Sequence, residues 1–129
     1  MIILDTHIWI WWVAQNPHLS LRNQEIIRTH QSQGLGVSMI SCWEVSKLVE
    51  KQRIILNIPL EEWLNQALSY PDIRLINLTI PIIVQSAKLV NFHKDPADQL
   101  IVATAKVYNC SLLTVDQKIL NYPHVLTLT

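Results

Sequence analysis

The fold is set by the stretch Met1-Ile2-Ile3-Leu4-Asp5-Thr6-His7, in which four apolar residues lead directly into a carboxylate. A short, fully apolar run is typical of a strand buried on both faces, as in a parallel sheet. Asp5 would then follow the carboxyl end of this strand, at the edge where open α/β sheets collect ligands and chemistry. The stretch Leu112-Leu113-Thr114-Val115-Asp116 repeats the pattern. We therefore expect Asp5 and Asp116 on one edge of a parallel sheet.

The composition indicates a single globular domain over residues 1–129, with half of its residues apolar and only 16% charged. This balance excludes an intrinsically disordered chain. Gly34 and Gly36 are the only glycines, which excludes a glycine-rich phosphate-binding loop. Ten basic residues balance ten acidic ones, so the chain should not coat nucleic acid indiscriminately. Bound cations could still supply positive charge for a polyanionic substrate.

The cysteines and the apolar runs favour a cytoplasmic protein that does not enter a membrane. No apolar run approaches the roughly 20 residues that a membrane span needs, and no signal-peptide pattern precedes the first strand. Cys42 and Cys110 lie far apart and have no cysteine or histidine neighbours at zinc-ligand spacing. We expect two reduced thiols and no zinc site.

Apolar periodicity and turn residues predict strands that alternate with helices. The expected strands cover residues 1–4, 36–40, 73–76, 111–115 and 125–128. The expected helices cover residues 6–15, 21–33, 41–51, 59–69, 81–90, 96–108 and 116–120. Alternation of this kind predicts an α/β fold with three layers, in which helices flank both faces of a short parallel sheet of four to five strands.

Two acidic residues at strand ends have an ordinary structural explanation, since Asp5 and Asp116 could simply cap the helices that follow. Ending a buried strand in a carboxylate nevertheless desolvates the charge unless something pairs with it. No Lys or Arg lies within fifteen residues of Asp5 in the sequence. We therefore favour a functional role for Asp5, and Asp116 repeats its situation.

Two further acids stand near expected helix starts. Glu44 completes the capping box Ser41-Cys42-Trp43-Glu44, which alone would explain it. Asp98 would be favoured in a first turn by the helix dipole, and Asp95 is most simply the cap of the same helix. Val102 and Ala105 follow Asp98 at helical spacing, so Asp98 projects from a largely apolar face.

Taken together, the four acids Asp5, Glu44, Asp98 and Asp116 predict a metal site. All four are expected on the edge where parallel strands end and the following helices begin. Clustered carboxylates repel one another unless they share a cation, and oxygen ligands select hard ions such as Mg²⁺ or Mn²⁺. Two such ions would clamp a phosphodiester and activate water for in-line attack.

The residues at these four places resemble the PIN-domain ribonucleases, in particular the VapC-type toxins of type II toxin–antitoxin systems. The resemblance spans essentially the whole chain and is carried by the segments Ile3–Thr6, Ser41–Val45, Asp95–Ala105 and Leu112–Asp116. It implies a PIN fold and Mg²⁺- or Mn²⁺-dependent cleavage of RNA, with Asp5, Glu44, Asp98 and Asp116 as metal ligands. It also implies homodimerisation and inhibition by a small antitoxin protein.

Several neighbouring residues have possible supporting roles in this site. Thr6, Asp95 and Thr114 could hold the acids or bound water, although a strand residue at Thr114 needs no function. His7 and His93 border the same edge, but we leave both outside the catalytic set because most lone histidines only pack or face solvent. Lys47 and Lys51, one turn apart, could meet phosphates, but a solvated helix face explains them better. Members of the resembled family often carry arginine at the positions of Gln99 and Val115. This chain therefore has less positive charge there to bind RNA phosphates.

The segment Ile8–Val13 contains three of the five tryptophans and is apolar around nearly the whole helix circumference. Such a helix is either deeply buried or covered by a partner chain. Without interleaved Lys or Arg, core and interface packing explains all five tryptophans (Trp9, Trp11, Trp12, Trp43 and Trp63) better than base stacking. We expect the segment to lie partly under a second copy or an antitoxin helix.

Two other functions stay open from the sequence. Enzymes that form an aspartyl phosphate also begin with an apolar strand ending in Asp, but their second Asp would fall at His7. A non-catalytic PIN-like interaction module would keep the fold without the activity, and the presence of all four acids argues against it.

Overall fold

One parallel sheet runs through the middle of the chain in the computed structural model, which describes residues 1–129. Its strands are β1 (Ile2–Leu4), β2 (Leu35–Ser38), β3 (Ile73–Ile76), β4 (Leu112–Leu113) and β5 (Thr127–Leu128). The strand order is β3-β2-β1-β4-β5, so the first strand of the chain is central. All four neighbouring pairs are parallel, which confirms the expected topology.

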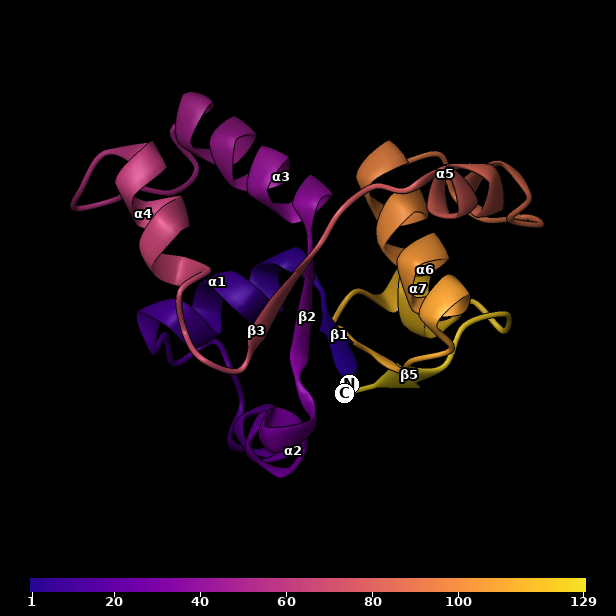
Figure 1. The fold of residues 1–129 in the computed structure, drawn as a ribbon, viewed down its shortest axis with the longest axis horizontal. Coiled ribbons are helices and arrows are strands. Elements are labelled where there is room, and N and C mark those ends of the chain that lie inside the picture. The colour runs from indigo at the N-terminus through magenta and orange to yellow at the C-terminus, as the bar shows by residue number, and fades with distance from the viewer.

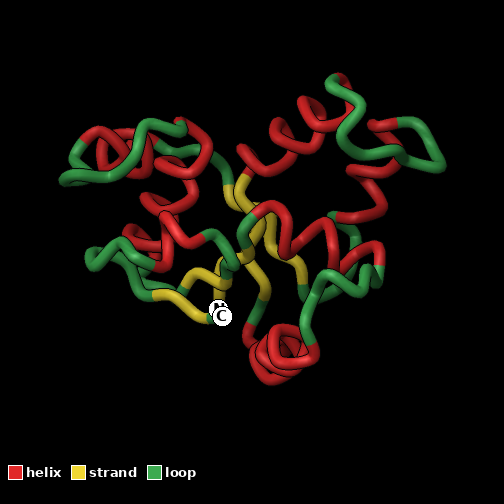
Figure 2. Tube along the Cα trace, turned by 180° about the vertical axis from the view of Figure 1, so that it is seen from behind, coloured by secondary structure: helices red, strands yellow, loops and turns green.

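Seven α-helices cover the two faces of this sheet. They are α1 (Thr6–Ala14), α2 (Leu21–His30), α3 (Met39–Glu50), α4 (Leu60–Ala67), α5 (Ile80–Ala87), α6 (Pro96–Tyr108) and α7 (Gln117–Leu120). Helices α1 to α4 lie on one side of the sheet and α5 to α7 on the other, and the two termini lie next to each other (Figures 1 and 2). This arrangement confirms the three-layer α/β fold.

The apolar strands explain the two cores, because successive side chains of a strand point to opposite faces. Ile2 and Leu4 of β1 join a core with α1, whose Trp9 is fully buried. Ile3 points the other way, into a core with Ile101 of α6. On that face Gly36 leaves room for its neighbours, since a Cβ there would come within 2.7 Å of Ile3 Cδ1.

The start of α3 differs from the sequence-based expectation. A strand over 36–40 and a helix opened by a Ser41–Glu44 capping box were expected, whereas the strand ends at Ser38 and the helix begins at Met39. Ser38 caps the helix, because its hydroxyl accepts a hydrogen bond from the backbone N–H of Ile40 at 3.2 Å. The capping-box prediction was wrong, since a second serine three residues earlier takes that role.

Most other boundaries agree to within a few residues. Helix α2 ends at His30 and passes into a 3₁₀ turn, Gln31–Gln33, before Gly34, which has a φ of 103°. Helix α4 begins at Leu60, one residue later than expected, because Pro59 itself is the cap residue. Strands β4 and β5 are two residues each, shorter than the apolar runs that predicted them.

The tryptophan-rich helix is buried on one side only. Ile8, Trp9 and Ile10 are buried, whereas Trp11 and Trp12 are partly exposed. The chain's own core therefore covers half of the segment, and a partner over the rest stays a prediction. None of the helices combines the length and the apolar character needed to span a membrane.

Candidate functional site

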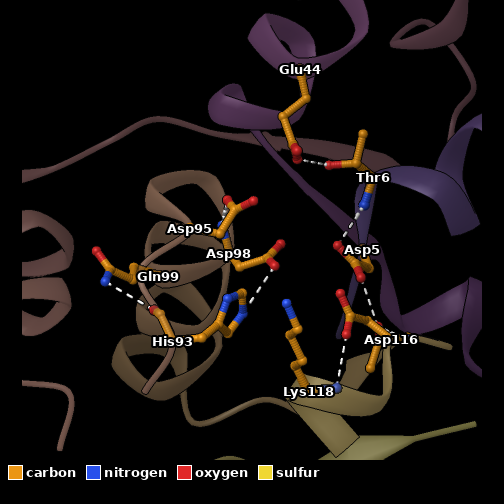
Figure 3. A network of polar contacts seen from close by, with 10 residues as sticks. Asp5, Thr6, Glu44, His93, Asp95, Asp98, Gln99, Asp116 and Lys118 are labelled. Carbon is orange, nitrogen blue, oxygen red and sulfur yellow. Dashed lines mark hydrogen bonds and ion pairs between the residues drawn. The ribbon is translucent and has the colours of Figure 1, made fainter. Parts of the chain in front are cut away.

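The carboxyl ends of β1, β2 and β4 and the start of α6 bring the predicted acids to one edge of the sheet. Asp5 follows β1 and caps α1, and Asp116 caps α7 three residues beyond Leu113, the β4 residue that pairs with Leu4. Glu44 extends from α3, and Asp98 lies in the first turn of α6. Figure 3 shows their side chains around a common space. We call Asp5, Glu44, Asp98 and Asp116 the acid cluster.

Asp5 is held in a fixed orientation at the end of the central strand. Its side chain accepts a hydrogen bond from the backbone N–H of Thr6 at 2.9 Å and another from the hydroxyl of Thr114 at 2.6 Å. The residue is only 9% exposed. Burial raises the pKa of Asp5 above its ordinary value, and the nearby Asp116 adds to the increase.

Thr114 links the two strand-end acids. Its hydroxyl donates to Asp5 and also accepts a hydrogen bond from the backbone N–H of Asp116 at 3.0 Å. Asp116 in turn accepts from the backbone N–H of Lys118 at 2.8 Å, which caps α7. Thr114 is therefore more than a β-branched strand residue, the explanation that the sequence favoured.

Glu44 is held by hydroxyl groups rather than by a helix cap. The hydroxyl of Thr6 hydrogen-bonds to the Glu44 carboxylate and, at 2.9 Å, to the hydroxyl of Ser41. Burial raises the pKa of Glu44, and the carboxylates of Asp5 and Asp95 raise it further. Since α3 begins at Met39, the capping box no longer explains a glutamate at this position.

Asp98 shows the strongest effect of the neighbouring charges. Burial, together with the carboxylates of Asp5, Asp95, Asp116 and Glu44, raises the pKa of Asp98 to about 8. Only 13% of its side chain is exposed. The shift follows from the position of Asp98, which is largely buried and has like charges nearby that disfavour its ionised form.

His93 is the one side chain of opposite potential charge in contact with the acid cluster. Its Nε2 lies 3.1 Å from Asp98 Oδ2, at ion-pair spacing but without the alignment of a hydrogen bond. The side chain of Gln99 donates to the backbone carbonyl of His93 at 3.1 Å, which holds that loop against α6. Gln99 therefore stabilises the loop that carries His93.

No Lys or Arg side chain forms an ion pair with the acid cluster. The only ion pairs made by Lys or Arg in the chain are Arg28 with Glu25 and Lys47 with Glu50, both at the surface. As the side chains lie, no three of the His, Cys, Asp and Glu side chains come close enough to share one ion. Free carboxylates that repel one another are expected to stand apart, and a cation would have to draw them together.

Sequence reasoning did not assign three residues of this edge. Ser41 contacts Thr6 across 35 residues, so no local pattern reveals that contact, whereas His93 lies five residues before Asp98 in a loop without a recognisable motif. The side chain of Lys118 points toward the space between the acids (Figure 3). Its position two residues after Asp116 is the only sequence signal for it. His7 is exposed beside Asp5.

A groove of about 510 Å³ adjoins the acid cluster. Its walls are the outer face of α3 and the first residues of α6, and Glu44 and Asp95 line it at the end next to the cluster. Asp95 is the cap of α6, as expected, because its side chain accepts from the backbone N–H of Asp98 at 3.1 Å. Of the acid cluster, Glu44 is the member that lines this groove.

The sequence as a whole is similar to one family of known proteins. Residues 2–125 match the profile of the family described as PIN domain. A relative from Mycobacterium tuberculosis (strain ATCC 25618 / H37Rv), named Ribonuclease VapC22, is 33% identical over 124 residues, which are 95% of this chain and 92% of the relative.

Solved structures are similar over the full length. A toxin–antitoxin complex from Klebsiella pneumoniae contains a chain with a TM-score of 0.69 and 21% identity, and the match covers 100% of this chain and 97% of that one. FitAcB from Neisseria gonorrhoeae gives a TM-score of 0.71 at 21% identity, with the same coverage. At this level of identity the likeness supports the fold.

Proposed function

The chain belongs to the PIN-domain family, and on that premise we propose that it is a metal-dependent endoribonuclease, the toxin of a toxin–antitoxin pair. The observation that carries the proposal is the acid cluster itself. Its members gather at one edge of the sheet, burial and the neighbouring carboxylates raise the pKa of Asp98 to about 8, and no Lys or Arg forms an ion pair with them. A relative named as a ribonuclease supports RNA as the substrate.

The chemistry of the donors fits hard divalent cations. Asp5, Glu44, Asp98 and Asp116 would hold Mg²⁺ or Mn²⁺, since the set offers carboxylate oxygens and no thiolate. Bound ions of this kind stabilise negative charge on a phosphodiester and lower the pKa of water. The proposal also explains the electrostatics, because a cation would relieve the repulsion that raises these pKa values.

The remaining residues of the edge would orient the acids and the substrate. Thr6 and Thr114 fix the directions of the Glu44 and Asp5 carboxylates by hydrogen bonds. Lys118 points into the space between the acids and would bind a phosphate oxygen of the RNA (Figure 3). His93, whose Nε2 lies 3.1 Å from Asp98 Oδ2, would hold the Asp98 carboxylate in place.

We propose two protein partners. The Klebsiella pneumoniae neighbour is a toxin–antitoxin complex, which supports an antitoxin that binds this chain. Helix α5 exposes Ile80, Ile83 and Val84, which share one helix face by their spacing, and 77%, 51% and 44% of these residues are exposed. An apolar face of this kind favours a homodimer.

Cys42 and Cys110 are free, as expected in the reducing cytoplasm where we propose that the protein acts.

The test is cleavage of structured and unstructured RNA by the purified protein. We expect cleavage with Mg²⁺ or Mn²⁺ and none with EDTA. Asp5→Asn should lower the rate by about 100-fold or more, because it replaces a ligand oxygen that carries charge. Equal activity of Asp5→Asn would end the proposal. Failure of the wild-type protein to cleave any RNA would favour a non-catalytic interaction module.

A further inference from the structure

The groove beside the acid cluster changes character along its length. At one end Glu44 and Asp95 line it, next to the cluster. Toward the other end its lining includes Lys47, Lys51 and Arg53, which belong to α3 and the turn that follows. We call these three cations the basic stripe. Three of the ten Lys and Arg residues of the chain therefore lie within seven consecutive positions of a neutral protein.

The cations of the basic stripe are free to bind another molecule. Lys51 and Arg53 are exposed and make no ion pair. Lys47 pairs with Glu50 at 3.0 Å, but the side chains of both are well exposed, 40% and 66%. Exposed pairs of this kind contribute little stability and exchange partners readily. Glu50 lines the groove as well, so Lys51 and Arg53 are its two unpaired positive charges and Lys47 is a third that must leave Glu50 to bind an anion.

An aromatic side chain lines the same groove as Glu44 and the basic stripe. Trp43 lines the groove and is 51% exposed, whereas each of the other four tryptophans is buried or partly buried. The ammonium group of Lys47 lies 5.7 Å from the centre of its ring. Trp43, Lys47 and Lys51 follow one another at four-residue spacing, so they form a row about 12 Å long on one face of α3.

An exposed aromatic ring in a row with cations is the arrangement by which proteins hold single-stranded nucleic acid. The cations follow the phosphates, and an unpaired base stacks on the ring. A duplex keeps its base faces covered and could use the cations alone. The acidic end of the groove repels phosphate unless metal ions occupy the acid cluster. Bound metal ions would therefore draw the strand from the basic stripe toward the proposed catalytic site.

From this juxtaposition we infer that the groove between α3 and the start of α6 binds the unpaired RNA segment that flanks the cleaved bond. Trp43 stacks on a base, and Lys47, Lys51 and Arg53 bind the phosphates beside it. The inference deepens the proposed function and rests on it, because it assumes that RNA reaches the acid cluster. It makes single-stranded RNA the preferred substrate.

The experiment measures binding of a fluorescein-labelled, mixed-sequence single-stranded RNA of about 12 nucleotides by fluorescence anisotropy. Asp98→Asn serves as the background, because it preserves the shape of the side chain and prevents cleavage. Adding Trp43→Ala should weaken binding by about fivefold or more, and Trp43→Phe should retain most of the affinity. Lys51→Ala with Arg53→Ala should reduce the slope of log affinity against log salt by about 1.4.

Two controls separate the groove from general effects. Lys88→Ala removes an exposed cation at the end of α5, away from the groove, and should bind as the background does. The same RNA annealed to its complement should bind more weakly and lose little affinity with Trp43→Ala. Thermal unfolding of each variant checks the fold, and the Lys51 and Arg53 substitutions at exposed positions test the inference even if Trp43→Ala fails to fold.

The outcomes separate this inference from the proposed function. Wild-type affinity in the groove variants, in a protein that cleaves RNA, would overturn the groove and leave the nuclease intact. Equal binding of duplex and single strand would overturn the stacking role of Trp43. Normal RNA binding combined with lost inhibition by the antitoxin would assign the groove to a protein partner instead. Loss of single-strand binding in all groove variants supports the inference, even if no cleavage is found.

Discussion

The acid cluster and the basic stripe lie next to each other but differ in how far their charged groups are buried and in what those groups bind. The acids are buried or partly buried, hydrogen-bonded to Thr6 and Thr114, and left without a Lys or Arg partner. The cations of the stripe are largely exposed, and only Lys47 forms an ion pair, with Glu50. Buried like charges cost stability, whereas exposed charges cost little. The comparison indicates that the chain keeps a costly charge arrangement where we propose chemistry, and a nearly cost-free one where we propose only contact with RNA.

The largest effect should come from removing one charge of the acid cluster. Asp98→Asn should lower RNA cleavage by about 100-fold or more, because it removes a ligand of the proposed ions. In metal-free buffer at pH 8 the same variant should unfold at a higher denaturant concentration than the wild type, because the repulsion on Asp98 is gone. Cleavage assays and urea unfolding measure the two effects.

Glu61→Gln is the matched control for the two expected effects of Asp98→Asn, which are slower cleavage and higher stability without metal. It neutralises an exposed acid in the first turn of α4, away from the cluster, and should change neither quantity appreciably. If Asp98→Asn retains full activity, or destabilises the metal-free protein at pH 8, the acid cluster is an ordinary structural feature.

The second prediction concerns the pH dependence of the metal-free protein. The pKa of Asp98 is 3.8 in ordinary surroundings and about 8 in the fold, so between these values the folded state binds more protons than the unfolded state. The free energy of unfolding should therefore be highest below pH 4 as far as this group is concerned. It should decrease as the pH rises toward 8, with a slope of at most about 1.4 kcal/mol per pH unit for one proton.

Chemical unfolding across this pH range, with and without Mn²⁺, measures that slope. Mn²⁺ should remove most of the loss near pH 8, because a bound cation favours the charged carboxylates. Asp98→Asn should flatten the metal-free curve. A wild-type curve that rises from pH 4 to pH 8 with the same slope as Asp98→Asn would refute the shift.

A smaller effect is expected from the hydroxyl that joins two of the acids. Thr114→Val keeps the shape of the side chain but removes the donor to Asp5 and the acceptor for the backbone N–H of Asp116. We expect a loss of about 1–3 kcal/mol in stability and a clear loss of cleavage, since a buried polar group remains unpaired. Calorimetry and cleavage assays measure both.

Thr104→Val is the matched control, because Thr104 is fully buried and its hydroxyl donates only to the backbone carbonyl of Leu100 at 2.7 Å. It should cost less stability and keep the cleavage rate. Equal behaviour of the two valine variants in cleavage would show that Thr114 does not orient the acids.

The smallest effect on stability should come from the basic stripe. Lys51→Ala combined with Arg53→Ala should change the free energy of unfolding by less than about 0.5 kcal/mol, because both side chains are exposed and unpaired. The same variant should raise KM for single-stranded RNA and leave kcat nearly unchanged. A decrease in kcat as large as that of Asp98→Asn would erase the distinction between the two regions.

The fold was predictable because its signals are local. Apolar runs such as Ile2–Leu4 need no partner to be recognised as buried strands, and Asp95-Pro96 marks the start of α6 at the expected residue. Strand alternation with helices then leaves few topologies. The start of α3 was misjudged because Met39 and Ile40 are apolar enough to continue a strand, and two serines competed for the cap.

The candidate site was only partly predictable. The edge of the sheet follows from topology, so the meeting of Asp5 and Asp116 could be expected from two strand ends. The contact of Thr6 with Ser41 and Glu44 joins segments about 35 residues apart, and His93 reaches Asp98 from a loop without a pattern. Such contacts depend on helix packing, which no local signal encodes. The roles of these residues stay predictions.

Titration of the metal-free protein with Mn²⁺ in an isothermal calorimeter at pH 8 tests the central claim most directly. If the gathered carboxylates form a cation site, the wild-type protein should give saturable heat together with proton release from Asp98, and Asp98→Asn should lose most of both. Heat no greater than that of dilution, or identical titrations for the wild type and Asp98→Asn, would contradict the account.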